Sequence, residues 1–403
     1  MKLACVVQRY GADIAGGSEA HCRALAERLA GSHAVTVLTS CARDYVTWAN
    51  AHPAGETVEN GVRVVRFPVR RQRHLGHFSD LSDEVFDGPT ARERQQAWFA
   101  ENGPDVPDLL AHLRTHATAY DLVLFWTFRY SPSFFGLPIV ADRAVLLPTA
   151  EEDRALDLGI LEGFFNTPAG YIFLTPEEAA LVEARAGGRL RPATTIGMGL
   201  DASPASPGSQ QALAVLGVPP RYVLYLGRVD RNKGCHTLLE YFEEYVAAGG
   251  DTTLVLAGPA KIRIPAHPRI RTLGYVPDEA RDALISGAQA LVVPSPYESL
   301  SIVLLEAWNR GVPALVNAQC AVLKGQVRRA NGGLHYRSQR EFSEGLDFLL
   351  RHRAERDQLG LQGLAYVERE YRWPTVLRRV EALLDEVMTA RRAREQAEAS
   401  STG

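Results

Sequence analysis

Two glutamates, Glu298 and Glu306, stand eight positions apart in a stretch that reads as strand, loop and helix. The apolar residues 291–293 end at Pro294, as a buried strand would, and the apolar spacing after Ser299 predicts a helix that Ser299 caps. Carboxylates accept hydrogen bonds from sugar hydroxyls, and helix N-termini attract anions, so we expect a ligand with both phosphate and hydroxyl groups. The spacing alone leaves an alternative open, in which both glutamates are ordinary helix residues.

A second motif, from Gly227 to Gly234, follows the apolar residues 222–226 and carries Arg228 and Lys233. Glycine lets a ligand approach the backbone closely, arginine offers a bidentate fork to a phosphate, and lysine adds a point charge. This pattern predicts a diphosphate site, although a charged turn without a ligand would look the same.

The first half of the chain has one comparable loop. Gly16 and Gly17 lie between a strand expected at residues 3–7 and a helix expected at 19–30, with Ser18 as its cap. A strand, a glycine loop and a helix start can form a phosphate or acceptor site. The loop lacks the G-x-G-x-x-G spacing of a dinucleotide site, and two glycines chosen for a tight turn are the alternative.

Both halves of the chain alternate short apolar runs with helical periods, which predicts an α/β fold of two doubly wound, Rossmann-like domains. Residues 201–212 are rich in Ser and Pro and predict a linker. We therefore expect a first domain at 1–200, a second at 213–373, a last helix at 374–394 and a disordered tail at 395–403.

Composition narrows the class of protein. The chain has 403 residues and a formal net charge of −3, which does not indicate a nucleic-acid-binding protein. Its five cysteines are scattered without metal-type spacing and predict reduced residues of a cytoplasmic protein. We expect no signal peptide, because Met1 and Lys2 lead directly into a strand, and no membrane span, because no apolar run reaches about 18 residues.

The sequence around the two glutamates, P-S-x-x-E-S-L-S-x-x-x-L-E-A-x-x-x-G-x-P, resembles the E-x7-E signature of retaining glycosyltransferases of family four. The resemblance implies that Glu298 lies beside the transferred sugar and that Glu306 holds the nucleotide ribose. The family's G-R-x-x-x-x-K-G element is matched at residues 227–234, which implies that Arg228 and Lys233 clamp the diphosphate. One departure is Ser301, where the family usually has glycine.

Further positions follow from the same resemblance. Gly16, Gly17 and Glu19 resemble the family's G-G-x-E element, which faces the donor. The expected donor and nucleotide contacts are Gly227, Gly258, Tyr275, Ser299, Leu300, Ser301 and Glu306. The family often has a sugar-contacting histidine after the strand that we expect at residues 122–126, where this chain has Trp126 and Thr127. No such histidine role is therefore carried over.

The resemblance implies a GT-B fold, with the two domains facing across a cleft and the last helix crossing back to the first domain. The first domain would then be the acceptor side, and the second would bind the nucleotide sugar. The implied reaction moves a sugar from a UDP-, GDP- or other nucleotide-linked donor to a hydroxyl of a glycan, a lipid-linked acceptor or a small molecule. The alternatives are a nucleotide-sugar epimerase or hydrolase of the same fold, and a non-catalytic subunit that binds sugar nucleotides.

Three further predictions concern the acceptor, metals and membranes. Trp126, which ends an expected strand, and Glu151 and Asp153, which follow another, are candidates for the acceptor side. Trp126 is also a good core residue, and the acidic residues could equally start the next helix. The chain has no D-x-D triplet, so we expect neither a metal nor another cofactor. The basic run at residues 63–75 could contact an anionic membrane or acceptor, or be a solvated loop. The residues that follow, 77–107, read as irregular except for a helix near 92–100.

Overall fold

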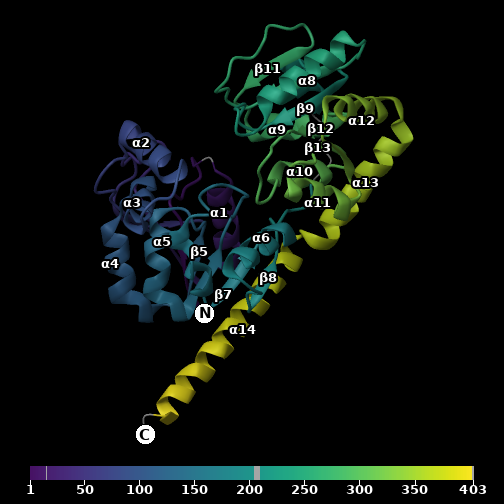
Figure 1. Cartoon of the computed structure of the whole chain (residues 1–403). Helices are drawn as coiled ribbons and strands as arrows, with labels where there is room; N and C mark the ends of the chain where they lie inside the picture. Colours follow the sequence, from purple (N-terminus) through teal and green to yellow (C-terminus); the bar gives the residue numbers. More distant parts are fainter. Residues whose placement is uncertain (15, 204–208, 402–403) are drawn as a thin grey trace. The chain divides into compact units, whose positions relative to one another are not determined.

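The computed structural model describes residues 1–14, 16–203 and 209–401. The chain divides into two compact units. The first unit comprises Met1–Gly199 together with Val376–Gly403, and the second comprises Leu200–Thr375. Each unit has its own parallel sheet with helices packed against it (Figure 1).

The first unit contains an eight-stranded sheet in the order β3-β4-β2-β1-β5-β6-β7-β8. All neighbouring strands pair parallel except β3 and β4, which pair antiparallel. The order runs in opposite directions on the two sides of the β1–β5 pair. Its strands are β1 (Lys2–Val6), β2 (Ala34–Ser40), β3 (Gly55–Glu59), β4 (Val62–Phe67), β5 (Leu122–Trp126), β6 (Ala144–Leu147), β7 (Gly170–Phe173) and β8 (Ala193–Thr195).

The helices of the first unit cover a core of aromatic and aliphatic side chains. They are α1 (Gly17–Leu29), α2 (Leu75–Phe86), α3 (Arg92–Asn102), α4 (Pro107–His116), α5 (Ser131–Gly136), α6 (Pro176–Ala186) and the later part of α14 (Trp373–Ser401), with 3-10 turns at Ala117–Ala119, Leu137–Arg143, Gly159–Leu161 and Phe164–Asn166.

The prediction that residues 77–107 are mostly irregular is wrong. Helix α2 fills its first part and buries Leu81 and Val85, and α3 buries Trp98 and Phe99 beside them. A helix with only two buried apolar residues gives a weak periodic signal, so the partner helix decides its structure. Ser18 is likewise not the cap of α1, because the cap position is Gly16 and the helix has no side-chain cap.

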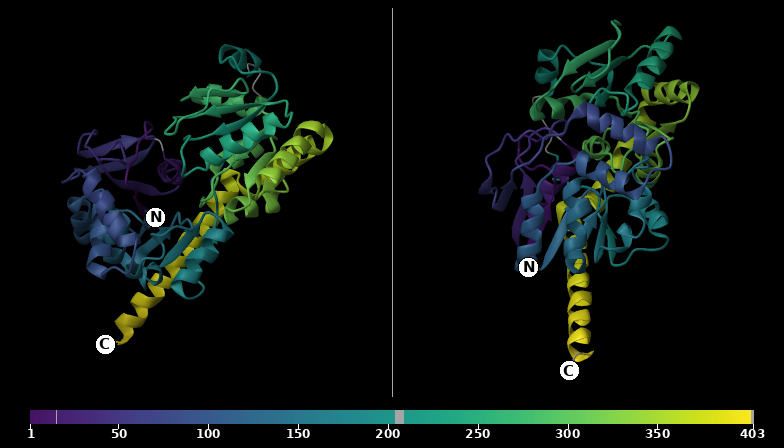
Figure 2. Two further views of the ribbon diagram at one scale, coloured as in Figure 1. Left: turned by 45° about the horizontal axis from the view of Figure 1, so that its top comes forward. Right: turned by 60° about the vertical axis from the view of Figure 1, so that its left-hand side comes forward.

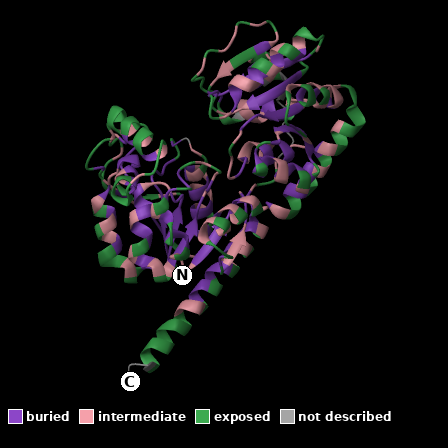
Figure 3. Ribbon diagram, in the orientation of Figure 1, coloured by how far each residue is buried: buried purple, intermediate pink, exposed green. Residues whose placement is uncertain are grey.

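The second unit contains a six-stranded, fully parallel sheet in the order β11-β10-β9-β12-β13-β14. Its strands are β9 (Tyr222–Leu226), β10 (Thr253–Ala257), β11 (Ile270–Gly274), β12 (Ala290–Val293), β13 (Ala314–Asn317) and β14 (Gly333–Tyr336). Its helices are α7 (Ser209–Val215), α8 (Cys235–Ala247), α9 (Asp278–Gly287), α10 (Ile302–Trp308), α11 (Ala321–Ala330), α12 (Gln339–Arg351) and α13 (Arg353–Glu370). Its central strands are buried (Figure 3).

The order of this second sheet reverses between β9 and β12. From β9 the chain adds β10 and β11 on one side, and from β12 it adds β13 and β14 on the other. In open parallel sheets, such a switch point leaves a crevice at the carboxyl ends of the two central strands, where ligands bind. The loops that follow β9 and β12 are those that carry Arg228, Lys233 and Glu298.

Two predicted boundaries in the second unit differ from the structure. Helix α10 begins at Ile302 with Ser301 at the cap position, so Ser299 is not the cap, and Glu298 lies in the loop four residues before the helix. The predicted linker, residues 201–212, ends inside α7, while residues 204–208 lie outside the described residues.

The prediction of a disordered tail from residue 395 is wrong for residues 395–401, because α14 continues through Ser401. The final residues are exposed, and the end of this helix extends away from the rest of the first unit in both views of Figure 2. Alanine, arginine, glutamate and glutamine have high helix propensity, which lets the helix continue without burying side chains. None of the helices in the described ranges is long and apolar enough to cross a membrane.

Candidate functional site

Lys233 and Glu298 meet at the switch point of the second sheet. Lys233 Nζ donates a hydrogen bond to Glu298 Oε1 at 2.7 Å, and both side chains are mostly buried, with exposed fractions of 28% and 12%. One residue comes from the loop after β9 and the other from the loop after β12, 65 positions later. The pair therefore places one cation and one carboxylate at the carboxyl edge of the two central strands.

Glycines bring the neighbouring loops into direct backbone contact. Gly234 has φ 70°, and a Cβ there would lie 2.3 Å from the carbonyl oxygen of Pro294. Gly258, with φ 140°, packs on Gly227, whose carbonyl oxygen would lie 2.0 Å from an added Cβ. Any larger residue at these positions would separate the loops, so the glycines set the shape of this edge.

Asp230 shapes the loop between these glycines. Its Oδ1 accepts the backbone N–H of Lys233 at 2.8 Å, and its Oδ2 lies 3.7 Å from Arg228 Nη2. The Arg228 side chain remains 44% exposed, whereas Asp230 is largely buried. The loop is therefore held from within by a carboxylate, while its arginine side chain reaches solvent.

Glu306 lies on α10 and forms an ion pair with Arg281 of α9. Burial raises the pKa of Glu306, and the charges of Arg281 and Arg310 oppose this rise. Arg310 Nη1 also donates to the backbone carbonyl of Glu306 at 3.0 Å. The two glutamates of the E-x7-E motif thus have different cationic partners, Lys233 for Glu298 and Arg281 for Glu306.

The remaining predicted donor contacts differ in exposure. Ser301 and Leu300 are buried, and the backbone N–H of Ser301 donates to Gln326 Oε1 at 3.3 Å. Gln326, on α11, is fully buried. Tyr275, directly after β11, has a side chain that is 81% exposed and so offers an aromatic face at the carboxyl edge of the same sheet.

In the first unit, the loop with Gly16 and Gly17 surrounds a buried ion pair. Arg9 Nε donates to Glu19 Oε1 at 2.9 Å, and both residues are about 5% exposed. A Cβ at Gly16 would lie 2.2 Å from Glu19 Oε2, so glycine is required by the carboxylate that folds over it, whereas a Cβ at Gly17 would meet nothing within 4 Å. Glu19 therefore forms its ion pair with Arg9 within the first unit.

Trp126 cannot offer its ring to an acceptor sugar, because it is fully buried. Its Nε1 donates to Nδ1 of His21, also buried, at 3.1 Å, and His21 Nε2 lies 2.8 Å from the Gly197 carbonyl oxygen. These contacts fix the neutral His21 with its proton on Nε2. The assignment of Trp126 to the acceptor side is therefore wrong, and its role is in the core.

The two acidic candidates that follow β6 are more accessible. Asp153 forms an ion pair with Arg129, and its Oδ1 accepts the backbone N–H of Ala155 at 3.0 Å. These contacts give Asp153 a role in shaping a turn, and Glu151 is partly exposed beside it. Thr149, directly before this segment, adopts φ 46°, an uncommon conformation for a β-branched residue.

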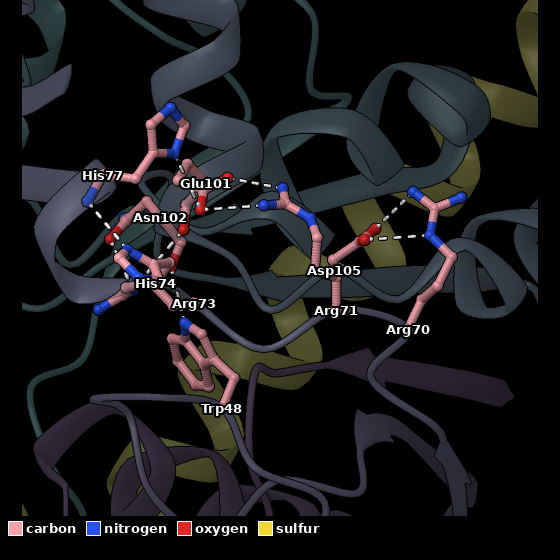
Figure 4. A network of polar contacts seen from close by, with 9 residues as sticks. All are labelled: Trp48, Arg70, Arg71, Arg73, His74, His77, Glu101, Asn102 and Asp105. Carbon is pink, nitrogen blue, oxygen red and sulfur yellow. Dashed lines mark hydrogen bonds and ion pairs between the residues drawn. The ribbon is translucent and has the colours of Figure 1, made fainter.

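The arginines of the basic run are paired with acids of the same unit (Figure 4). Arg70 contacts Asp105 through two hydrogen bonds of 3.1 Å, and Arg71 contacts Glu101 at 3.1 and 2.6 Å. Burial by itself would raise the pKa of Glu101, but the hydrogen bond and charge of Arg71 and those of His77 lower it overall. These pairs fasten the loop after β4 to α3 and to the residues just beyond it.

Arg73 and Arg66 also contact other residues of the first unit. Arg73 donates to the side chain of Asn102 at 3.0 Å and lies over the Phe78 ring, 4.4 Å from its centroid. Arg66 is buried and forms an ion pair of 2.8 Å with Glu59. The basic run therefore works mainly as a set of internal contacts.

Several site residues were not predicted from the sequence: Asp230, Arg281, Arg310 and Gln326. Asp230 stands in the predicted loop and had a usable signal, since an aspartate inside a tight turn often accepts backbone N–H groups. Arg281 and Gln326 lie on helices α9 and α11, and Arg310 lies in the turn after α10. Only the packing of these elements brings the three residues to the site.

Comparisons with known proteins agree with this geometry. Residues 214–364 match the family model for glycosyl transferases group 1. The chain is 31% identical over 108 residues to alpha-D-kanosaminyltransferase of Streptomyces kanamyceticus, which is 24% of this chain and 27% of that protein. It is 25% identical over 360 residues to glycogen synthase of Mycobacterium tuberculosis, which is 81% of each. The first match thus spans about a quarter of that relative's length.

Two solved structures illustrate the similarity in fold. Sucrose-phosphate synthase of Thermosynechococcus elongatus superimposes with a TM-score of 0.72 at 18% identity, over 97% of this chain and 100% of that chain. HepE of Anabaena, solved in complex with UDP-glucose, gives a TM-score of 0.67 at 16% identity, over 96% and 100%. Residues 214–364 are therefore similar to the group 1 glycosyltransferases, and the chain has the GT-B fold of these structures.

Proposed function

We propose that this protein transfers a sugar from a nucleotide sugar to an acceptor hydroxyl and retains the configuration at the anomeric carbon. The observation that carries the proposal is the Lys233–Glu298 pair at the switch point of the second sheet, with Arg228 on the same loop. The group 1 match over residues 214–364 supports it, and so does the similarity in fold to HepE, a protein solved with UDP-glucose.

The donor is expected to lie along the carboxyl edge of the second sheet. Gly227 and Gly258 leave room for a ligand at the backbone, and Arg228 and Lys233 supply positive charge for its diphosphate. Glu298 would then lie beside the transferred sugar and Glu306 at the ribose. The remaining contacts come from the Ser299–Ser301 loop and from the exposed ring of Tyr275.

The rate of the proposed reaction depends on how well the protein stabilises the leaving diphosphate. As the bond from the anomeric carbon to the diphosphate breaks, negative charge develops on the departing oxygen. Fixed cations stabilise that charge more in the transition state than in the ground state, so they raise the rate and not only the affinity. The departing diphosphate can itself receive the proton of the acceptor hydroxyl on the same face of the sugar, so no protein base is obligatory.

The protein is expected to work without a metal ion, because Arg228 and Lys233 take the place of a bound cation at the diphosphate. Turnover should then be insensitive to a chelator. Lys233→Ala should lower kcat by roughly 10²–10³ with donor saturating, the scale of removing one preorganised donor.

The test is to incubate the protein with UDP-, GDP- and ADP-linked sugars and a panel of acceptors, and to determine the anomeric configuration of the product by NMR. A product with the configuration of the donor is expected. An inverted product, activity that magnesium restores after chelation, or a Lys233→Ala enzyme at the parental rate would contradict the scheme. Free sugar or an epimerised donor, formed without acceptor, would instead identify a hydrolase or an epimerase.

A cytoplasmic location and peripheral contact with a membrane stay predictions. The ion pairs within residues 63–75 reduce the electrostatic free energy that binding to a membrane could contribute, because Arg70, Arg71 and Arg66 already pair with acids. The attraction of about 1 kcal/mol that each unpaired basic residue would add near an anionic surface is correspondingly smaller here.

A further inference from the structure

The second unit contains a cavity of about 300 Å³ that is lined by none of the expected donor contacts. It lies among the start of α8, the loops after β12 and β13, and the end of β14. Strands β12, β13 and β14 are neighbours in the sheet, and α8 follows β9, which pairs with β12. Its volume is at the lower end of the roughly 300–1,000 Å³ of small-molecule sites.

The wall of this cavity is fixed by backbone contacts. Gly234 packs against the carbonyl oxygen of Pro294, which leaves no room for a side chain. Asn317 Nδ2 donates to the same oxygen at 3.1 Å, and Asn317 Oδ1 accepts the backbone N–H of Gln319 at 3.0 Å. Three loops are thereby tied together, so the cavity is preformed and does not need to be opened by a ligand.

The charge in the cavity is positive. Arg337 is its one charged lining residue, and no carboxylate lines it. The Arg337 side chain is exposed, and across the described ranges its guanidinium has no hydrogen-bond or ion-pair partner. Glu341 of α12 is nearby, but its carboxylate accepts the backbone N–H of Arg337 at 2.7 Å. An arginine without a partner at the edge of a cavity suits a phosphate, which its planar fork can bind through two hydrogen bonds.

The rest of the lining suits a sugar. Tyr241 is partly exposed and offers its ring to the cavity, and an apolar face of a sugar ring packs well on such a surface. Tyr336 is buried and contributes only a small part of the lining. Thr237, His236 and Gln319 add a hydroxyl, an imidazole and an amide, which can exchange hydrogen bonds with sugar hydroxyls. A nucleobase would leave most of these polar groups unused.

We propose that this cavity binds a phosphorylated monosaccharide, with the phosphate on Arg337 and the sugar against Tyr241. It is a second site, separate from the donor site, and does not depend on the proposed transfer reaction. Gly234 directly follows Lys233, and Pro296, which also lines the cavity, stands two residues before Glu298. A ligand here would therefore touch both loops that carry the Lys233–Glu298 pair.

The test is titration calorimetry of the full chain with a panel of hexose monophosphates, with the matching free hexoses and with inorganic phosphate. At least one hexose phosphate should bind more tightly than phosphate, and the free hexoses should bind weakest. Arg337→Ala should weaken that binding by about tenfold or more, since a charge-assisted contact is lost. Arg340→Ala is the matched control, because Arg340 lies three residues further along the chain, in the first turn of α12, and its side chain pairs with Glu344 among the described residues.

The same samples are titrated with UDP, GDP and ADP, which report on the donor site independently. Saturating nucleotide should leave hexose-phosphate binding in place. The proposal is wrong if no hexose phosphate binds the folded protein, if inorganic phosphate binds equally well, or if Arg337→Ala and Arg340→Ala behave alike. Displacement of the hexose phosphate by nucleotide would place it in the donor site and would also overturn the proposal. Failure of UDP, GDP and ADP alike to bind would contradict the proposed function alone.

Discussion

At the scale of single residues, each glutamate of the E-x7-E motif forms an ion pair with a basic side chain. Glu298 pairs with Lys233 and Glu306 with Arg281, and both carboxylates are largely buried. A buried carboxylate needs such a partner, because removing the partner leaves an uncompensated charge. At Glu306 the charges of Arg281 and Arg310 favour the carboxylate, but burial outweighs them and raises the pKa.

The expected role of Glu306 can be tested against the ribose itself. If its carboxylate accepts the ribose hydroxyls, Glu306→Ala should weaken binding of the nucleoside diphosphate by roughly 1.5–3 kcal/mol, the scale of a hydrogen bond to a charged group. The variant should lose little further affinity when the ribose hydroxyls are removed, whereas the parent should lose affinity. Calorimetry with the nucleotide and its 2′,3′-dideoxy analogue measures both.

Arg281→Ala is the control for this prediction, since it removes the partner of Glu306 and leaves the carboxylate. It should still distinguish the nucleotide from its dideoxy analogue. Equal discrimination by the parent and by Glu306→Ala would remove Glu306 from the ribose site.

At the scale of an element, α1 is fixed to the first unit through His21. The ring of His21 is buried between the indole N–H of Trp126 and the carbonyl oxygen of Gly197. Burial lowers the pKa of His21 to about 4, and the contact with Gly197 opposes this only in part. Charging the ring would break the hydrogen bond from Trp126, because Nδ1 would then become a donor.

This geometry predicts a loss of stability in mild acid. An unfolded histidine has a pKa of about 6.5, so the depressed folded value contributes stability above that pH, and the contribution is lost as the pH falls toward about 4. Relative to a His21→Gln variant, the wild type should lose on the order of 2–3 kcal/mol more of its unfolding free energy between pH 7.5 and 4.5. Urea unfolding of the first unit, followed by hydrogen exchange of β1 and β5, measures this difference. Parallel pH profiles for the two proteins would show that His21 makes no such contribution.

At the scale of the whole molecule, the last helix of the chain forms part of the core of the first unit. Helix α14 starts in the second unit, but from Val376 it belongs to the first, and a Cβ on Gly170 of β7 would lie 2.6 Å from Val387. Its later part buries six apolar side chains: Val376, Val380, Leu383, Leu384, Val387 and Met388. At roughly 1.5–3 kcal/mol for each buried side chain, their sum is comparable to the roughly 5–15 kcal/mol stability of a typical domain.

Two truncated chains should distinguish how much each part of this helix contributes to stability. A chain that ends at Thr375 should lose protection from hydrogen exchange in β1 and β7, because the first unit loses part of its core. A chain that ends at Arg394 should keep the melting temperature of the full protein, since the residues after Arg394 bury no side chain among those described. Equal protection of β1 in the chain that ends at Thr375 would show that the helix is not needed.

The class of fold, most of the strands and the two motifs of the second unit could be predicted from the sequence alone. Strands β5, β6, β9 and β12 are short apolar runs bounded by turn residues, and the glycines at 227, 234 and 258 mark close backbone approaches. Apolar periodicity and the conformational freedom of glycine are local properties, so a contiguous stretch of sequence reveals them.

Which of these residues contact one another could be learned only from the tertiary structure. The contact of Lys233 with Glu298 depends on β9 and β12 being neighbours, and that of Glu306 with Arg281 depends on the packing of α9 against α10. The structure also selects the core alternative for Trp126 and shows the internal pairing of Arg70 and Arg71, which the sequence did not predict. Strand order and helix packing are set by the whole core, because each element must bury its apolar face against others that are distant in the chain.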